Sequence, residues 1–195
     1  MMRIFLAGAT GVIGTRLVPL LVEAGHEVAG MTRSAAKADQ VRDAGAVPVI
    51  CDVYDLDALT AAVIDFRPDL VMHQLTDLPD DATLLPDRAE ANARIRTEGT
   101  RNLIAAARAA GAKRFLAQSI AWEPAGGRGQ VIQDHEAAVL DIDGVVVKYG
   151  QFYGPGTYYE DQHPPHPRVH VYDAAARTIP LLEASTGVII VADVA

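Results

Sequence analysis

The segment from Gly8 to Gly14, which reads GATGVIG, constrains the fold more than any other part of this sequence. It follows an apolar run typical of a buried strand, Arg3–Ala7, and precedes an amphipathic helical pattern over Val12–Ala24. Glycines at this spacing allow a tight turn and close approach of a phosphate group, to which the helix N-terminus offers free N–H groups. The loop therefore predicts a dinucleotide pyrophosphate site rather than a turn that binds nothing. The residues expected to face the ligand are Gly8, Thr10, Gly11, Val12, Ile13 and Gly14.

The rest of the chain continues this alternation of strand and helix patterns. Further strands are predicted at Glu27–Thr32, Val47–Asp52, Asp69–His73, Lys113–Ser119, Gly144–Tyr149 and Gly187–Val191. Helices are predicted at Ala35–Ala44, from an Asp55 cap to Phe66, at Pro86–Ala110, Ile132–Leu140 and Asp173–Ala184. Such alternation favours an α/β fold with a doubly wound parallel sheet of the Rossmann type. We expect one domain over residues 1–195, in which residues 153–195 are the reduced remnant of a substrate-binding lobe.

Composition narrows the range of partners. Half of the 195 residues are apolar, so the chain can bury one sizeable core. A net charge of −8 gives no electrostatic reason to bind nucleic acid or an anionic membrane. The single cysteine, Cys51, excludes an internal disulfide, and no apolar run approaches the ~18 residues of a membrane span. We expect a cytoplasmic protein that acts on a small molecule.

The end of the second predicted strand bears on the choice of dinucleotide. An NAD site usually has an acidic residue there, which accepts hydrogen bonds from the ribose 2′-hydroxyl. This sequence instead has Arg33 and Ser34, then Lys37, and no carboxylate before Asp39. A planar guanidinium matches a 2′-phosphate, so NADP(H) is favoured over NAD(H) unless these side chains are merely solvated. Asp52, at the end of the third strand, is expected to meet the adenine amino group or to cap the next helix.

Several motifs resemble those of the short-chain dehydrogenase/reductase superfamily, and most closely its extended branch of epimerase/dehydratase-like proteins. They are the loop at residues 8–14, the N…GT.NL stretch at 92–103, the strand at 114–119, the KYGQFYGPGT turn at 148–157 and the segment at 169–173. The resemblance implies that Ser119 is the catalytic serine and that the turn at 150–153 flanks the nicotinamide. It also implies that the cofactor is lined by Val53, Gln74, Leu75, Thr76, Asn92, Lys148, Gly150 and Phe152. A homodimer through the helices at 86–110 and 132–140 is implied in the same way.

The chain departs from this family at the residues that transfer protons. The family's chemistry depends on Tyr-x-x-x-Lys, in which the lysine lowers the tyrosine pKa. None of the six tyrosines has a lysine four residues later. Alignment on the helix that contains Glu136 places Arg128 and Ile132 at the two positions, and the segment after Trp122 is short. Tyr153 is our candidate for a replacement proton donor, and Lys148 could stand in for the missing lysine.

Two other groups of residues are weaker candidates, one for a metal site and one for a hydrolase site. The three histidines between residues 163 and 170 could suggest a metal, but proline-rich surroundings favour a solvated loop, and we expect no metal. Ser119 has no nucleophile elbow around it, and only His73 and His135 are candidate bases, which disfavours a hydrolase. The simpler interpretation of His135 is a position on an exposed helix face.

Three functions remain open from the sequence. The first is an NADP(H)-dependent oxidoreductase or epimerase-like enzyme on a small carbonyl or hydroxyl substrate. The second is a catalytically degenerate NADP(H)-binding sensor or partner protein, and the third is a non-redox cyclase or isomerase that reuses the pocket. The missing Tyr-x-x-x-Lys favours the second, whereas the retained Ser119 strand and FYGPGT turn favour the first, which we prefer narrowly.

Overall fold

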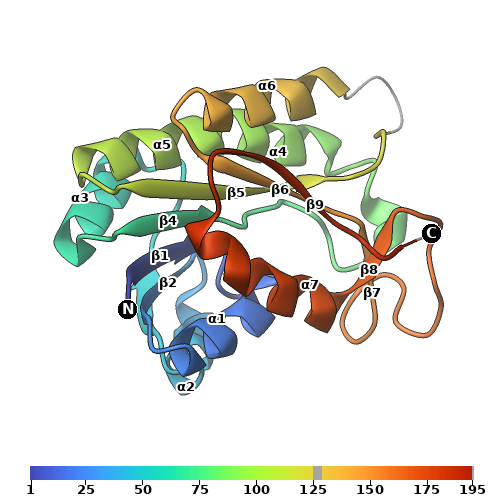
Figure 1. Cartoon of the computed structure of the whole chain (residues 1–195), viewed down its shortest axis with the longest axis horizontal. Helices are drawn as coiled ribbons and strands as arrows, with labels where there is room; N and C mark the ends of the chain where they lie inside the picture. Colours follow the sequence, from blue (N-terminus) through green and yellow to red (C-terminus); the bar gives the residue numbers. More distant parts are fainter. Residues whose placement is uncertain (125–128, 195) are drawn as a thin grey trace.

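The computed structural model describes residues 1–124 and 129–194. Among these residues, a seven-stranded sheet has the order β3-β2-β1-β4-β5-β6-β9 (Figure 1). Its strands are β1 (Arg3–Ala7), β2 (Glu27–Thr32), β3 (Val47–Ile50), β4 (Leu70–His73), β5 (Arg114–Ile120), β6 (Val145–Tyr149) and β9 (Gly187–Val191). Every neighbouring pair is parallel. The predicted doubly wound parallel sheet is therefore confirmed.

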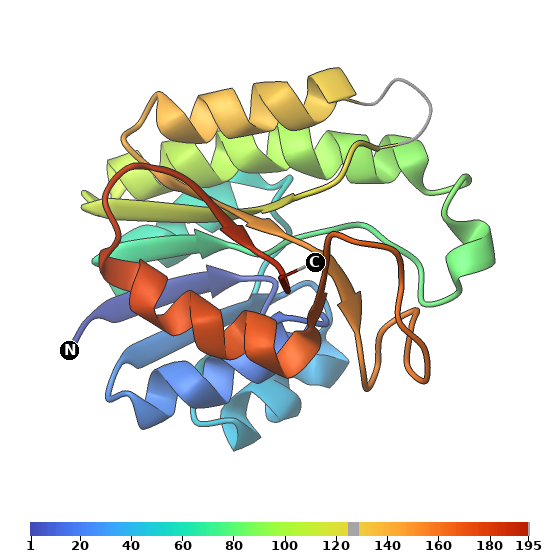
Figure 2. The same cartoon turned by 45° about the vertical axis from the view of Figure 1, so that its right-hand side comes forward.

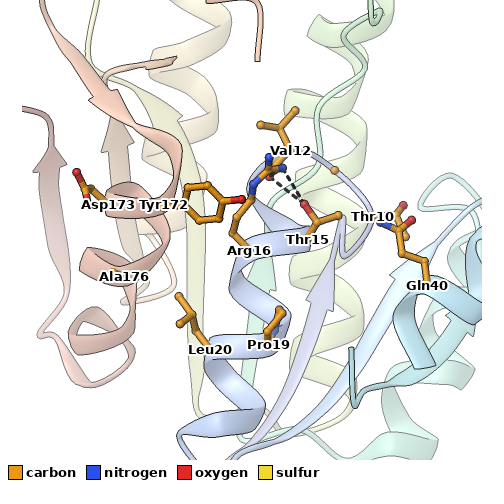
Figure 3. A pocket seen from close by; sticks show the side chains of 11 residues that line it. Thr10, Val12, Thr15, Arg16, Pro19, Leu20, Gln40, Tyr172, Asp173 and Ala176 are labelled. Atoms are coloured by element: carbon orange, nitrogen blue, oxygen red, sulfur yellow. Dashed lines mark hydrogen bonds between the residues drawn. The ribbon is translucent and has the colours of Figure 1, made fainter. Parts of the chain in front are cut away.

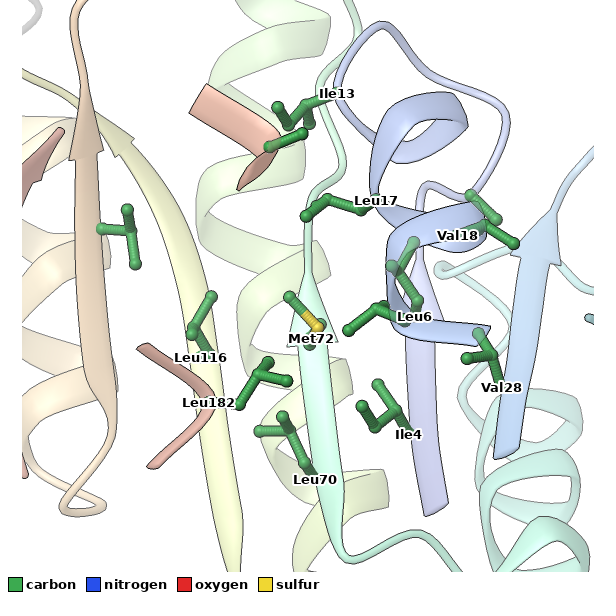
Figure 4. Packing of buried hydrophobic residues seen from close by; sticks show 14 of the residues in the cluster. Ile4, Leu6, Ile13, Leu17, Val18, Val28, Leu70, Met72, Leu116 and Leu182 are labelled. Atoms are coloured by element: carbon green, nitrogen blue, oxygen red, sulfur yellow. The ribbon is translucent and has the colours of Figure 1, made fainter. Parts of the chain in front are cut away.

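Helices cover both faces of this sheet (Figures 1 and 2). One face carries α1 (Gly14–Glu23), α2 (Ala38–Asp43) and α7 (Val171–Thr178), and the other carries α3 (Leu56–Phe66), α5 (Thr100–Ala109) and α6 (Gly129–Leu140). In β1, Ile4 and Leu6 point into the core under α1, whereas Phe5 and Ala7 point into the core under α3 and α5 (Figure 4). Because both faces are covered, the strands are mainly apolar, and several of their polar residues lie at the strand ends.

The long helix predicted from Pro86 to Ala110 is divided. It consists of α4 (Ala89–Arg94), a π-helical turn over Ile95–Gly99, and α5. The turn buries the side chain of Arg96, which is 4% exposed. Short 3-10 turns occupy Ala35–Lys37, Ala82–Leu84 and Ile179–Glu183. A π-helical turn rotates the residues that follow it, which a regular helical periodicity does not anticipate.

The last quarter of the chain contributes to two sheets. Strands β7 (Gln151–Tyr153) and β8 (Arg168–His170) pair in parallel as a small separate sheet. After them α7 packs on α1, and β9 extends the main sheet beside β6. Within the predicted lobe remnant, the residues after 170 thus belong to the main sheet and to the helices that cover it. Of the helices in the described residues, none is long and apolar enough to cross a membrane.

Candidate functional site

The glycine loop lies where the strand order reverses, between β1 and β4. In a parallel sheet this reversal opens a crevice beyond the carboxyl ends of the strands, where ligands bind. Gly8 has φ +96°, and a Cβ there would lie 2.8 Å from the carbonyl oxygen of Gln74. A Cβ at Gly14 would lie 2.1 Å from the Gly8 carbonyl oxygen. The fold itself therefore requires glycine at these two positions.

Gly11 is different, because the fold does not require a glycine there. It is exposed, and a Cβ at this position would meet only the Gly8 carbonyl oxygen at 3.4 Å, an ordinary contact. Beside it, α1 begins without a side-chain cap and without an acidic residue in its first turn. The bare backbone and the helix N-terminus leave room and positive potential for an anion. The residues present fit the pyrophosphate of a dinucleotide.

The end of the crevice at which the sequence predicts the adenosine lies beyond β2. Ser34 donates its backbone N–H to the Thr32 hydroxyl, which is 3.1 Å from the Thr10 hydroxyl. Arg33 is half-exposed, and its guanidinium lies 3.7 Å from the carboxylate of Asp77. The sequence has no carboxylate after Arg33 before Asp39, but the fold brings Asp77 to Arg33 from the segment after β4. Lys37 makes no ion pair with the described residues.

Three more of the predicted cofactor residues lie at this end of the crevice, where each one is tied to a neighbouring segment by a hydrogen bond. The Asp52 carboxylate accepts the backbone N–H of Tyr54 at 3.0 Å, so it caps the turn that follows β3. Val53 is buried, and its carbonyl accepts a hydrogen bond from Asn102. Asn92 accepts the backbone N–H of Asp77 at 3.2 Å. The structure thus brings these residues to the expected edge, and their contact with a cofactor stays a prediction.

The segment after β4 crosses the crevice next to the loop. Gln74 is buried, Leu75 is half-buried, and Thr76 is exposed. Leu75 is held from both sides: its N–H donates to His73 Nδ1 at 3.2 Å, and its carbonyl accepts from the Gln118 side chain at 3.1 Å. The backbone that faces the Gly8 turn is therefore fixed by β4 and β5 together.

Ser119 belongs to a buried polar group that the sequence did not reveal as such. Its hydroxyl donates to the Glu136 carboxylate at 2.5 Å, and Lys148 pairs with the same carboxylate at 2.9 Å. Ser119 and Lys148 are register partners in β5 and β6, while Glu136 comes from α6. Glu136 appeared in the sequence only as an alignment marker. In this arrangement the Ser119 hydroxyl is hydrogen-bonded to the Glu136 carboxylate, and Lys148 is ion-paired with the same carboxylate.

A second buried chain of hydrogen bonds joins β4, α5, α6 and β5. His73 Nδ1 accepts from Leu75, so His73 Nε2 donates to the Thr100 hydroxyl at 3.1 Å. Thr100 then donates to His135 Nδ1 at 2.8 Å, and His135 Nε2 donates to the Gln118 carbonyl at 2.9 Å. His135 is only 1% exposed, so its assignment to an exposed helix face was wrong. Neither imidazole contacts the Ser119 hydroxyl.

Both imidazoles are held neutral. Burial lowers the pKa of His73 well below its usual value, and the nearby His135 and Arg96 lower it further. Burial first and Arg96 second lower the pKa of His135 to about 4. Burial also lowers the pKa of Arg96 to about 10. Neutral imidazoles suit this chain because each one donates a single hydrogen bond and accepts another.

Tyr153, the proposed replacement acid, lies at the end of β7. Its hydroxyl donates to the Asp193 carboxylate at 3.0 Å, and its ring lies between those of His163 and His170. Desolvation and the Asp193 contact raise its pKa, which makes it a weaker acid. The remaining predicted residues of this turn have packing roles. Gly150 passes the β8 backbone, where a Cβ would lie 2.7 Å from Arg168, and Phe152 packs against Tyr149.

A hollow of about 790 Å³ lies on the outer side of the glycine loop, between α1 and α7 (Figure 3). Arg16 and Tyr172 face each other across it, with the guanidinium carbon 5.5 Å from the ring centre. Arg16 also donates to the Pro155 carbonyl, which ties α1 to the FYGPGT turn. The carboxyl ends of β5 and β6, where the chemistry is expected, do not line this hollow.

Two of the three histidines, His163 and His170, line a smaller hollow of about 320 Å³ beside Tyr153. Within residues 1–124 and 129–194, no group of three His, Cys, Asp or Glu side chains is arranged to hold a metal. Of the two residues aligned with the missing Tyr-x-x-x-Lys pair, Arg128 lies outside the described residues and Ile132 is buried in α6. A hydrophobic side chain thus occupies the lysine position.

Comparison with known sequences gives consistent matches. The model of the NAD dependent epimerase/dehydratase family matches residues 4–126. A 3-diazoavenalumate denitrifying reductase from Streptomyces sp. is 39% identical over 186 residues, which covers 81% of this chain and 59% of that protein. A 3-beta-hydroxysteroid dehydrogenase from Mycolicibacterium neoaurum is 28% identical over 116 residues, or 58% of this chain and 31% of that protein. The chain spans about three-fifths or less of the length of these curated relatives.

Solved structures share the fold at low sequence identity. A UDP-glucose 4-epimerase from Thermotoga maritima, solved with UDP-glucose, has a TM-score of 0.80 and 18% identity, covering 98% of this chain and 77% of that one. The enzyme WbmH from Bordetella bronchiseptica, solved with NAD+, has a TM-score of 0.76 and 19% identity, covering 99% and 76%. At these identities the likeness establishes the fold.

Proposed function

Because the chain belongs to the NAD dependent epimerase/dehydratase family, we propose that it binds NADP(H) and reduces a small electrophilic substrate. The observation that carries the proposal is the open backbone at Gly11, beside two glycines that the fold itself requires. The loop and the start of α1 would hold the pyrophosphate, and Arg33, Ser34 and Lys37 would hold the 2′-phosphate. Bound there, the reduced nicotinamide would supply a hydride.

The protein's own side chains narrow the class of substrate. Reduction of a carbonyl requires a proton on its oxygen, which a general acid near neutral pKa delivers. This chain lacks the Tyr-x-x-x-Lys pair, Ser119 is committed to Glu136, and Tyr153 has a raised pKa. A substrate that takes up hydride without a proton from the enzyme fits these residues better than the small carbonyl or hydroxyl compound favoured by the sequence.

A diazonium group meets that requirement. The relative that is 39% identical is described as a denitrifying reductase of a diazo compound. In such a reduction the carbon gains a hydride and its electron pair, the carbon–nitrogen bond breaks, and N2 leaves with the bonding electrons. The net change is R–N2⁺ plus NADPH to R–H, N2 and NADP⁺, which needs no acid or base. We therefore assign the substrate to the diazonium class.

Calorimetric titration with NADPH and NADH tests the cofactor half of this proposal. We expect NADPH to bind at least tenfold more tightly, because only it presents a 2′-phosphate to Arg33. Binding of neither nucleotide would contradict the proposal outright, and tighter binding of NADH would contradict the choice of NADP(H).

Turnover assays test the proposed substrate class. NADPH oxidation is followed with an aryl diazonium salt and with the matching aryl aldehyde, and released N2 is measured by mass spectrometry. We expect oxidation and N2 with the diazonium salt only, at a rate above the enzyme-free reaction. Equal reduction of the aldehyde would show that a proton donor is present after all. NADPH binding without turnover of either compound would support the second candidate, a non-catalytic sensor, which the engagement of Ser119 and Tyr153 favours.

A further inference from the structure

A positively charged cluster lies at the adenosine end of the crevice. The carboxylate of Asp77 lies between two arginines: Arg33 is 3.7 Å from one oxygen, and Arg88 is 3.8 Å from the other. Arg33 follows β2, Asp77 lies in the segment after β4, and Arg88 is the residue before α4. Two segments that are distant in the sequence, the end of β2 and the stretch between β4 and α4, thus bring two guanidinium groups to one place.

Within residues 1–124 and 129–194, neither guanidinium makes a hydrogen bond to a protein group. Both distances exceed the 2.7–2.9 Å of a charge-assisted hydrogen bond. The side chains of Arg33 and Arg88 are 51% and 53% exposed, whereas that of Asp77 is 12% exposed. By contrast Arg94, on α4, donates two hydrogen bonds to Glu98. The N–H groups of Arg33 and Arg88 are therefore available to a ligand.

The charges in this cluster do not balance. Among these three side chains two guanidinium groups face one carboxylate, so the trio carries one net positive charge near the expected 2′ position of the cofactor. The Asp52 carboxylate at the same end accepts the backbone N–H of Tyr54. We propose that Arg88 is a second ligand of the 2′-phosphate of NADP(H), together with Arg33. This inference rests on the proposed NADP(H) function and adds a specificity-determining residue to it. A phosphate oxygen accepts from several N–H donors at once, so it suits a pair of guanidinium groups.

Asp77 acts as the positioning residue of this pair. Its backbone N–H donates to Asn92 at 3.2 Å, and its carboxylate is largely buried. It therefore presents a fixed negative charge between two long side chains that would otherwise be disordered in solvent. The same charge disfavours a bound phosphate, but it is outnumbered by the two arginines.

Titration of Arg88 variants with NADPH and NADH tests the inference. Arg88→Ala is expected to weaken NADPH binding by roughly tenfold to a hundredfold, since a hydrogen bond to a charged group has about that value. Binding of NADH should change less than about twofold, because its 2′-hydroxyl carries no charge. Arg88→Lys keeps the charge without the planar fork and should give an intermediate loss. Arg108→Ala, an exposed arginine in the last turn of α5, is the matched control for net charge.

The outcomes separate this inference from the proposed function. Suppose that wild-type protein prefers NADPH and that Arg33→Ala removes this preference. If Arg88→Ala then keeps the preference, the inference about Arg88 fails and the proposed cofactor stands. If Arg88→Ala weakens both nucleotides equally, Arg88 does not read the 2′-phosphate. If wild-type protein shows no preference for NADPH, the proposed cofactor fails first. A thermal melt of each variant confirms folding, and Arg88→Lys provides the result if Arg88→Ala does not fold.

Discussion

Acid should weaken this fold through the buried His135, and the size of the effect follows from its surroundings. The pKa of His135 is lowered from an ordinary 6.5 to about 4, first by burial and then by the positive charge of Arg96. Glu136 opposes this shift but does not cancel it. The folded protein therefore keeps His135 neutral at pH values where the unfolded chain binds a proton. The stability from this neutral histidine is complete above pH 6.5 and is lost as the pH falls toward 4.

The magnitude can be worked out from the two pKa values. Between pH 7 and pH 5 the unfolded chain becomes almost fully protonated at this residue, while the folded protein stays mostly neutral. The linkage relation gives a loss of about 2 kcal/mol in the free energy of unfolding over that interval. His73 shifts in the same direction and adds to the loss.

Urea unfolding of wild type and His135→Gln at pH 7 and pH 5 measures this loss. Glutamine can still hydrogen-bond in the chain of Thr100 and Gln118 but does not titrate, so the variant should lose about 2 kcal/mol less than wild type. His166→Gln, at an exposed position, is the matched control and should behave as wild type. If wild type and His135→Gln lose the same stability between the two pH values, the buried neutral histidine is not the cause.

Three further changes probe the loop, the buried carboxylate and a helix cap. Gly14→Ala should prevent folding, whereas Gly11→Ala should keep the wild-type melting temperature in a thermal melt. In calorimetric titration, Gly11→Ala should bind NADPH at least tenfold more weakly than wild type. Glu136→Gln should lower the free energy of unfolding in urea by about 1–3 kcal/mol, because a charged acceptor shared by a serine and a lysine is lost. Asp55→Ala removes the cap of α3 and should cost about 1 kcal/mol in the same assay, while Asp65→Ala, exposed near the other end of that helix, should not destabilise.

The sheet and the glycine loop could be predicted because their signals are local. Each strand is a short apolar run between turn residues, and all seven strands of the main sheet were expected within two residues of their observed ends. The role of Gly14 follows from contacts within the loop, whereas Gly8 is required by the close approach of Gln74 after β4, although the loop's glycine spacing already marks both positions. The π-helical turn at Ile95–Gly99 was missed because its residues have the same apolar spacing as a regular helix.

The contacts between distant segments could not be predicted in the same way. Asp77 lies 44 positions from Arg33, and nothing in either neighbourhood marks them as partners. His135 looked like a residue of an exposed helix face because its burial depends on Thr100 and Gln118, which come from other elements. In both cases the sequence shows a charged or polar side chain but does not show the partner that the fold brings to it from another segment.

The glycine loop and the region of the missing Tyr-x-x-x-Lys pair are held by different contacts. The chain can therefore lack the proton donor and still have the predicted cofactor loop. The close contacts and backbone hydrogen bonds that hold the loop come from β1, β2 and the segment after β4. Ser119 and Lys148 remain useful without catalysis, because Glu136 joins them and so fixes α6 to β5 and β6. Retention of Ser119 is therefore explained by packing alone and does not require a carbonyl substrate. Under the proposed function, the loop would still hold the hydride donor, and hydride acceptors that need no proton would be the substrates of such a site.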